Sequence, residues 1–370
     1  MQRYDVVIIG SGPAGSSTAL NIHRMDPDLA SRTVVLEKAR HPREKLCGGG
    51  LTRKVDLLLT KLGLKVEVPF VQLDMLRIIY RGRNYDYLQQ EWVKVIRRRE
   101  FDAWLAGKLT QRGVALHQGE EVTGLRRLKD GVVVTTSKDS YKARVVVAAD
   151  GVHSVVRKKA DFPAGRRLMR CLVVEMPADV NKERVWLFKA MINDWACNEM
   201  GAYGYYWEFP AWEGGKPILQ CGLGVMDTDP DRKVVVKQVF RSILRKRGIS
   251  MDDHQLMGYP IRAYDPEYEP AQSHILLVGD ASGVDLLTGE GISESLEYGV
   301  LAAETIVDAF RADDFSFKLY KQALANSRLG KEMSRNCQWA YKCFTPDWEK
   351  MVPTRLEAFK RADTLERLKV

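Results

Sequence analysis

The chain has 370 residues, of which 45% are hydrophobic and 28% charged, and its formal net charge is +9. This composition is that of a globular protein of two or three domains, and it excludes a fibrous or largely disordered chain. No apolar run approaches the ~20 residues of a transmembrane helix, and the N-terminal apolar stretch is too short for a signal peptide. We therefore expect a cytoplasmic protein. The six cysteines form no C-x-x-C pair and the histidines are scattered, so no metal site is predicted.

The predicted elements change in character along the chain. The first part alternates buried strands at residues 4–9, 33–37 and 144–149 with helices at 16–25 and 101–109. From about 170 to 270, short aromatic-rich strands are predicted at 171–176, 185–190, 203–209 and 218–225, with one helix at 231–246. A last buried strand at 274–278 precedes a helix from about 290 to 311, and the remaining residues are predicted to be helical.

The glycine-rich segment after the first strand is typical of a dinucleotide site. It reads G-x-G-x-x-G between a strand and a helix, and a glutamate ends the next strand. Glycines let the backbone approach a pyrophosphate at the helix N-terminus, and the carboxylate would accept hydrogen bonds from ribose hydroxyls. That carboxylate argues against a 2′-phosphate, and hence against NADP in this site. The cofactor-binding residues expected here are Gly10, Gly12, Pro13, Ala14, Gly15, Glu37 and Lys38.

Three later motifs favour FAD over NAD as the dinucleotide. Arg98 begins R-x-x-F-D-x-x-L, Asp150 follows one buried strand, and Asp280 follows another, where a carboxylate suits the ribityl hydroxyls of a flavin. The helix predicted after G-E-G at 289–291 would direct free N–H groups at the flavin ring and favour its reduced, anionic form. Further cofactor contacts are expected from Arg98, Asp150, Gly279, Asp280, Gly289, Gly291 and Ile292.

Over roughly residues 4–310, the order of these motifs resembles that of FAD-dependent proteins with the p-hydroxybenzoate hydroxylase fold. Within it, K-L-C-G-G-G-L at 45–51, Y-x-W-x-F-P at 205–210 and L-T-G-E-G-I at 287–292 resemble the geranylgeranyl reductase family. The resemblance implies FAD-dependent reduction of isoprenoid carbon–carbon double bonds. It also implies flavin contacts from Cys47, Gly48 and Gly49, and substrate contacts from Gly50, Leu51, Tyr205, Trp207, Phe209 and Pro210.

The expected fold class is α/β, with a Rossmann-like FAD-binding domain, an inserted antiparallel β-sheet substrate domain and a helical C-terminal tail. The FAD-binding domain would be discontinuous, formed by residues 1–75, 96–163 and 272–310. Residues 76–95 and 164–271 would form the β-rich substrate domain, and residues 311–370 the C-terminal region.

Two features bear on the reaction. Cys47 lies in a glycine-rich loop, where its thiol could deliver a proton after hydride transfer from flavin N5. Most lone cysteines, however, are inert buried hydrophobes. The alternating aromatic residues at 203–209 could wall an apolar cavity for a prenyl chain, although such alternation is also typical of plain sheet core.

Two surface features leave membrane contact open. The helix predicted at 231–246 carries a basic face that is either solvated or suited to anionic lipid or a diphosphate, formed by Lys233, Lys237, Arg241, Arg245, Lys246 and Arg247. The aromatic residues Trp339, Tyr341, Phe344 and Trp348 would either contact a membrane or cap the substrate domain. No motif supports nucleic-acid binding.

Three functions compete. The first is a reductase acting on a prenyl or lipid-like substrate, with electrons from an external donor such as NADPH or a ferredoxin, because only one G-x-G-x-x-G is present. The second is an oxygen-using flavoprotein, a monooxygenase or halogenase acting on an aromatic or quinone-like substrate, because one fold supports both chemistries. The third is a non-catalytic flavin or lipid carrier.

Overall fold

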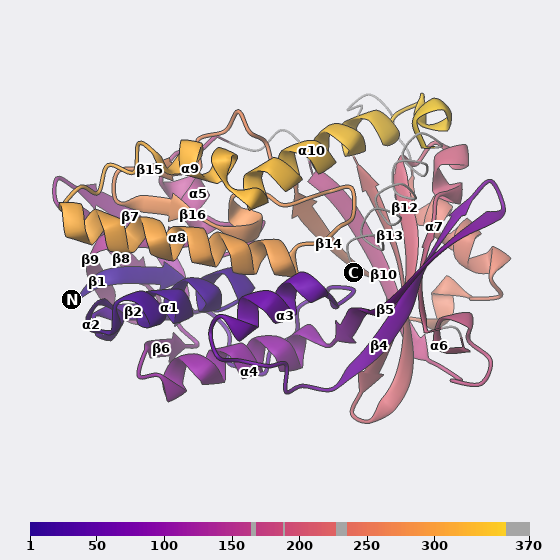
Figure 1. Ribbon diagram of the computed structural model, residues 1–370, viewed down its shortest axis with the longest axis horizontal. Coiled ribbons are helices and arrows are strands. Elements are labelled where there is room, and N and C mark those ends of the chain that lie inside the picture. Colours follow the sequence, from indigo (N-terminus) through magenta and orange to yellow (C-terminus); the bar gives the residue numbers. More distant parts are fainter. Residues whose placement is uncertain (164–167, 188, 227–234, 353–370) are drawn as a thin grey trace.

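The computed structural model describes residues 1–163, 168–187, 189–226 and 235–352, and within these ranges the strands form two eight-stranded sheets (Figure 1). The first sheet has a parallel centre in the order β16-β9-β1-β2-β6. Those strands are β1 (Gln2–Ile9), β2 (Thr33–Glu37), β6 (Ala115–Gln118), β9 (Ser140–Ala148) and β16 (Ile275–Leu277). Antiparallel strands extend the sheet on the β9 side only: β8 (Gly131–Thr136) pairs with β9, β7 (Val122–Leu128) pairs with β8, and β15 (Ala271–Gln272) pairs with β16.

Helices bury the central strands of this sheet, which explains why these strands are almost uniformly apolar. Helices α1 (Pro13–Met25), α4 (Arg98–Gln111) and α8 (Ile292–Ala312) share one apolar cluster with them. Because β2 and β9 flank β1 on opposite sides, the strand order reverses at β1. Ligands of such sheets bind at this reversal, beyond the carboxyl ends of the strands.

The second sheet is mainly antiparallel, in the order β14-β10-β13-β12-β11-β4-β5-β3. Its strands are β3 (Gly50–Thr52), β4 (Phe70–Tyr80), β5 (Arg83–Ile96), β10 (Leu168–Pro177), β11 (Ala190–Asp194), β12 (Gly204–Glu213), β13 (Lys216–Met226) and β14 (Met257–Arg262). In Figure 1 it stands beside the first sheet, with the long β4–β5 hairpin crossing in front. The remaining helices are α2 (Pro27–Ser31), α3 (Arg53–Thr60), α5 (Val155–Lys159), α6 (Arg184–Leu187), α7 (Val236–Lys246), α9 (Tyr320–Asn326) and α10 (Arg328–Cys343), with short 3-10 turns at Ala196–Met200, Met251–Asp253 and Gly279–Ala281.

One strand prediction is wrong. The strand predicted at 185–190 is absent from residues 185–187, because α6 occupies Arg184–Leu187 and β11 begins only at Ala190. The reason is local hydrogen bonding: Trp186 N and Leu187 N both donate to Glu183 O at 3.0 Å, so this backbone pairs within itself rather than with a strand. The β4–β5 hairpin and strands β6, β7, β8 and β14 were not predicted.

Helix α7 packs its apolar side, including Val239, Phe240 and Ile243, onto the second sheet. That side therefore belongs to the core and cannot insert into a lipid surface. Of its predicted basic face, Arg247 pairs with Glu208 at 2.8 Å, and Arg241 pairs with Asp252 at 2.8 Å. Lys233 and the predicted helix start at 231 lie outside the described residues.

The C-terminal segment covers the second sheet. Phe344 and Trp348 are 0% and 4% exposed and pack in the cluster that contains Tyr205 and Trp207. Of the two roles expected for these aromatic residues, capping is the one that the contacts support. Residues 353–370 of the predicted helical tail lie outside the described residues. No helix in the described ranges is long and apolar enough to cross a membrane.

Candidate functional site

One cavity of about 890 Å³ begins at the carboxyl ends of β1 and β9 and continues beneath the second sheet. Its first part, the polar half, is lined by glycines and charged side chains. Its second part, the apolar chamber, is lined mainly by aliphatic, sulfur-containing and aromatic side chains, among them Leu76, Ile78, Trp92, Met169, Cys171, Met191, Trp195, Tyr205, Trp207, Phe209, Ile261 and Leu287. Of the residues described, no group of three or more His, Cys, Asp or Glu side chains could hold a metal ion.

The glycines of the first turn serve two different purposes. Gly10 has φ +101°, and a Cβ atom there would lie 2.4 Å from Ala149 O; at Gly15 it would lie 1.9 Å from Gly10 O. These two glycines allow close packing of backbone. A Cβ atom at Gly12 would instead meet only the guanidinium groups of Arg43 and Arg98, at 3.7 and 4.0 Å. Gly12 therefore opens onto the cavity opposite two cations, an arrangement that fits a pyrophosphate.

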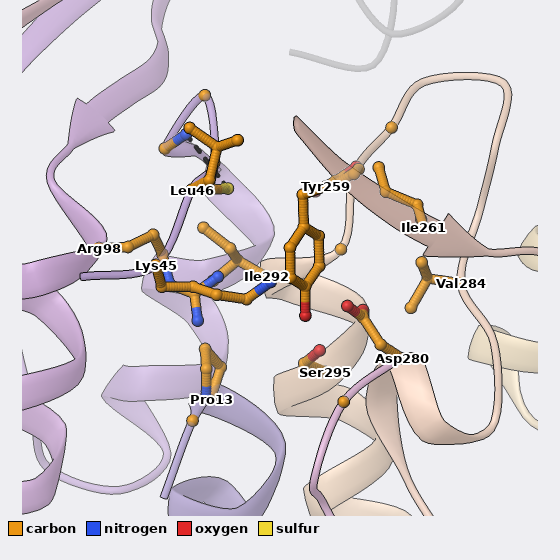
Figure 2. A pocket seen from close by; sticks show the side chains of 18 of the residues that line it. Pro13, Lys45, Leu46, Arg98, Tyr259, Ile261, Asp280, Val284, Ile292 and Ser295 are labelled. Carbon is orange, nitrogen blue, oxygen red and sulfur yellow. Dashed lines mark hydrogen bonds between the residues drawn. The ribbon is translucent and has the colours of Figure 1, made fainter. Parts of the chain in front are cut away.

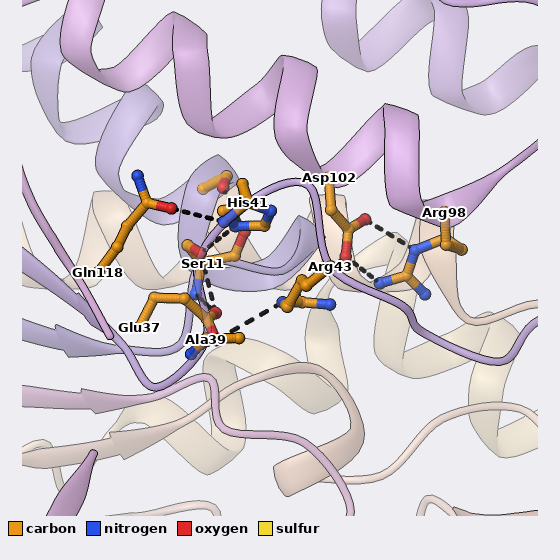
Figure 3. Close-up of polar contacts among 9 residues, drawn as sticks. Ser11, Glu37, Ala39, His41, Arg43, Arg98, Asp102 and Gln118 are labelled. Carbon is orange, nitrogen blue, oxygen red and sulfur yellow. Dashed lines mark hydrogen bonds and ion pairs between the residues drawn. The ribbon is translucent and has the colours of Figure 1, made fainter. Parts of the chain in front are cut away.

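A buried carboxylate fixes both cations (Figure 3). Asp102, which is 0% exposed, accepts from Arg98 Nε at 2.7 Å and from Arg98 Nη2 at 2.8 Å, and Arg43 Nη2 lies 3.2 Å from its Oδ2. Burial lowers the pKa of Arg98, but Asp102 more than compensates and holds it above its ordinary value. Arg43 was missed by the sequence analysis, because an arginine in an irregular loop carries no signal of its own.

Glu37 is held by groups on both sides of its carboxylate. Its Oε2 accepts from Ser11 N at 3.0 Å and Ser11 Oγ at 2.9 Å, and its Oε1 accepts from Ala39 N at 3.0 Å. Burial raises the pKa of Glu37, but Arg43, with Nε 3.5 Å from Oε1, and the bonds from Ala39 and Ser11 bring it below its usual value. The carboxylate is thus ionised and fixed at the cavity wall. Lys38 is exposed at the same rim.

The carboxyl-end aspartates lie on the cavity wall, as does a lysine that the sequence analysis did not assign to the site. Asp150 Oδ2 accepts from Val155 N at 2.7 Å, whereas its buried Oδ1 has no partner. Burial raises the pKa of Asp150. Near Asp280, Lys45 Nζ lies 3.1 Å from the ring centroid of Tyr259 (Figure 2). Burial lowers the pKa of Lys45 to about 8, which Asp280 opposes.

The segment before α8 meets the apolar chamber. Gly291 and Ile292 line the cavity where α8 begins. Gly289 has φ +67°, and a Cβ atom there would lie 2.3 Å from the Tyr205 hydroxyl, so only glycine fits beneath this tyrosine. Thr52 Oγ1 donates to Glu290 Oε1 at 2.5 Å, which ties the segment to the end of β3.

Strand β12 directs alternate side chains into the chamber. Tyr205, Trp207 and Phe209 line it, whereas Tyr206 packs on the opposite face against Phe240. Trp207 lies across β13: a Cβ atom at Gly222 would be 2.1 Å from its Cζ2. Gly222 and its neighbour Gly224 were missed, because a glycine inside a strand acquires meaning only once the ring above it is placed.

Cys47 lies where the two parts of the cavity meet. It is partly buried, it lines the cavity, and its Sγ accepts from Gly49 N at 3.4 Å. Gly48 lies under the Phe209 ring, since a Cβ atom there would be 2.6 Å from Phe209 Cε2. The Cys47 thiol thus stands between the polar half and the aromatic wall.

Most of the predicted site residues line this one cavity, and four do not. Gly15 and Gly279 lie in helix packing contacts, where a Cβ atom at Gly279 would lie 2.9 Å from Ala14 Cβ. Leu51 is 2% exposed in the apolar cluster of the first sheet. Pro210 is buried and lies outside the cavity wall, next to Phe209, which lines it.

The polar half fits a flavin dinucleotide. An open glycine faces two fixed guanidinium groups, an ionised carboxylate lies at the rim, and the buried Asp150 Oδ1 lacks a partner. Hydrogen-bond donors of the ligand, such as sugar hydroxyls, would satisfy that oxygen. The continuous wall then leads from the dinucleotide half into a chamber that suits an apolar ligand.

Comparison with known proteins agrees with this geometry. A family model described as FAD binding domain matches residues 3–284. The chain is 28% identical over 348 residues to an uncharacterised protein of Methanosarcina barkeri, covering 92% of this chain and 83% of that protein. It is 27% identical over 376 residues to a digeranylgeranylglycerophospholipid reductase of Methanocaldococcus jannaschii, covering 97% and 90%.

Two solved structures share the fold. A geranylgeranyl bacteriochlorophyll reductase-like protein of Thermoplasma acidophilum has a TM-score of 0.76 at 22% identity, with 92% of this chain and 88% of that chain covered. A flavin-dependent halogenase has a TM-score of 0.70 at 19% identity, with 95% and 68% covered. At these identities the likeness shows the fold alone.

Proposed function

Because the chain belongs to the FAD-binding domain family through residues 3–284, we propose that it is an FAD-dependent reductase of a prenyl lipid. Its substrate would be a geranylgeranyl-type chain, as in the relatives named digeranylgeranylglycerophospholipid reductase. The observation that carries the proposal is the single cavity of about 890 Å³, whose polar half adjoins an aromatic chamber at Cys47.

The residues of the polar half bind and orient the cofactor. Arg43 and Arg98 neutralise a pyrophosphate opposite Gly12, and Asp102 keeps both guanidinium groups in place. When bound, FAD supplies the hydride for the double bond. Fixed cations and backbone groups need no rearrangement when charge develops, which is the usual source of electrostatic stabilisation in active sites.

The residues of the chamber orient the alkene and exclude water. Tyr205, Trp207 and Phe209 hold the chain by apolar contact, and Phe344 and Trp348 close the cluster from above. Cys47 donates the proton to the carbon that does not receive hydride, and it is reprotonated from the polar half. The electron donor is external: NADPH, a ferredoxin or another flavin system. Contact with a membrane surface during substrate exchange remains part of this proposal.

The direct test is an anaerobic half-reaction. The FAD-loaded protein is reduced with dithionite and mixed with a digeranylgeranyl phospholipid or geranylgeranyl diphosphate. We expect the flavin to reoxidise and each reduced double bond to gain two hydrogens in the product mass. Substrate-stimulated oxygen uptake with an aromatic acceptor, and no anaerobic reoxidation, would instead identify an oxygen-using enzyme. Tight FAD binding without turnover by either route would identify a carrier.

The role of Cys47 has its own test. We expect Cys47→Ser to slow single-turnover substrate reduction by about 10²–10⁴-fold, the range for losing a general acid, because a hydroxyl is a far weaker acid. FAD content and chemical reduction of the flavin should not change. Cys337→Ser is the control, because Cys337 is buried in α10 outside the cavity wall. An unchanged single-turnover rate in Cys47→Ser would remove Cys47 from the mechanism.

A further inference from the structure

The loop that carries Cys47 is fixed to the second sheet at its far end. Gly49 O accepts from Ile96 N at 3.0 Å, and Gly49 itself has φ +81° with Ile96 O where a Cβ atom would stand. Gly50 then begins β3, paired with Val95 of β5. These contacts anchor the loop after the cysteine but leave the cysteine's own backbone to other partners.

One row of side chains across the sheet faces that backbone. Gln220 of β13 is paired directly with Glu175 of β10 on one side and with Phe209 of β12 on the other. Residues directly opposite in neighbouring strands point to the same face of the sheet. Phe209 contacts Gly48, the residue after Cys47, so the row lies under the loop.

Gln220 is 1% exposed and connects the row to Cys47. In the amide orientation that satisfies both of its ends, Nε2 donates to Cys47 O at 3.2 Å and Oε1 accepts from Arg97 Nη1 at 2.6 Å. The opposite orientation would place oxygen against the carbonyl and NH₂ against the guanidinium. Because a guanidinium can only donate, Arg97 determines that the NH₂ group faces Cys47.

Arg97 is itself held from the same row. It donates to Glu175 through Nη1 at 2.6 Å and Nη2 at 3.0 Å, and to Glu213 at 3.0 Å. Burial lowers the pKa of Arg97, but Glu175 and Glu213 bring it above its ordinary value. Arg97 precedes α4 with an extended backbone, so it serves the second sheet while the next residue, Arg98, serves the polar half.

We propose that Gln220 is a positioning residue for Cys47, and that Glu175 and Arg97 fix the amide that holds the Cys47 carbonyl. This proposal rests on the function proposed above for Cys47, which it deepens. The row ties the aromatic substrate wall and the proton donor to the same three strands. The thiol therefore keeps its place relative to the bound chain, as a proton donor must.

The test removes the amide and measures the reactivity of Cys47 rather than turnover alone. Gln220→Met keeps the length of the side chain without its hydrogen bonds. Gln220→Glu keeps an acceptor for Arg97 but places an oxygen against Cys47 O. In FAD-loaded protein, we expect iodoacetamide to alkylate Cys47 about tenfold faster in both variants than in wild type. A factor of about ten is the effect expected from losing one buried hydrogen bond.

The other cysteines and a second glutamine serve as controls. Cys197 and Cys221 are 0% exposed and report general loosening of the protein. Gln72→Met removes bonds to Leu73 O and Val93 O in the same sheet but leaves the bond between Gln220 and Cys47 O in place. In that control, the Cys47 alkylation rate should equal that of wild type. We also expect the Gln220 variants to lower the single-turnover rate without raising KM.

The proposal would be overturned if Cys47 in either Gln220 variant were alkylated at the wild-type rate. It would also be overturned if alkylation were accelerated equally at Cys47, Cys197 and Cys221. Selective acceleration at Cys47 supports it. The alkylation assay needs no substrate. Selective acceleration in a protein that reduces no prenyl chain would therefore preserve the positioning role while rejecting the proposed function.

Discussion

Trp207 lies across β13 because residue 222 has no side chain. A Cβ atom at Gly222 would stand 2.1 Å from Trp207 Cζ2, far inside contact distance, so in Gly222→Ala the ring must move into the chamber. We expect this overpacking to lower the free energy of unfolding by about 1–3 kcal/mol and to raise KM for long prenyl substrates. FAD content should stay at the wild-type level. Thermal unfolding, flavin absorbance and initial rates measure the three quantities.

Gly107→Ala is the matched control at the residue scale. Gly107 lies inside α4, and no atom lies within 4 Å of the position that its Cβ would occupy. Replacing this half-buried helical glycine, whose Cβ position is open, should raise the free energy of unfolding by about 0.5–1 kcal/mol without affecting KM. Equal effects of the two substitutions would contradict the role assigned to Gly222.

Sequence motifs identified those site residues that a local unit of strand, turn and helix brings to the cavity. Gly10, Gly12 and Glu37 meet there because a strand, turn and helix bring them together locally. Arg43 and Tyr259 reach the same cavity from an irregular loop and from β14, and nothing in their own sequence neighbourhood indicates it. Strand periodicity also separates motif neighbours: Phe209 lines the chamber and Pro210 does not.

Helix α8 begins with a buried acid whose titration should be measurable. Glu294 is 5% exposed, and its Oε2 accepts from Asp285 N at 2.9 Å. Burial, and then the nearby Asp285 carboxylate, raises the pKa of Glu294 well above its ordinary value. Ionised Glu294 therefore destabilises the fold above that raised pKa, and the cost disappears as the pH falls towards the unfolded-state value near 4.

Glu294→Gln removes this titration but keeps an acceptor for Asp285 N. We expect the variant to unfold at higher temperature than wild type at pH 8, with the difference shrinking towards pH 5. Glu304→Gln, at an exposed position of the same helix, should show no such trend. A wild-type advantage at pH 8 that is lost on acidification would reverse the sign and contradict the argument.

At the element scale, the buried strands β1, β2, β9 and β16 of the first sheet were predicted, whereas the β4–β5 hairpin of the second sheet was not. The uniformly buried β2 was expected with its bounds, Thr33–Glu37. Strand β5 is exposed over much of its length and places apolar residues at adjacent positions, such as Trp92 and Val93, so its period-two signal is weak. It is stabilised by pairing with β4, which no local pattern reveals. Residues 185–187 show the opposite case, since these strand-like residues form a turn of helix, α6, before β11 begins at Ala190.

The two sheets should respond together to the cofactor. The polar half is lined from the first sheet by Gly10 and Asp150, and from the second by Tyr259 of β14. FAD at 100 times its Kd should stabilise the protein by about 2.7 kcal/mol. We expect circular dichroism and tryptophan fluorescence, to which Trp92, Trp207 and Trp212 of the second sheet contribute, to shift to the same higher melting temperature. A fluorescence transition that does not move with FAD would contradict this coupling.

The path of the chain between the sheets has a consequence for synthesis of the protein. Strand β1, made first, pairs with β9, and β9 pairs in turn with β16, whose residues are made after every strand of the second sheet. Helix α1 also packs against α8, which is made much later: Ser17 Oγ donates to Leu296 O at 2.7 Å, and Gly299 leaves room for Ser17. Such distant partners make folding slow and leave one edge of β1, the edge that pairs with β9, open while the chain is on the ribosome. The nascent chain therefore acquires its cofactor crevice late in translation, and chaperones that cover exposed β1 should raise the yield of flavin-loaded protein.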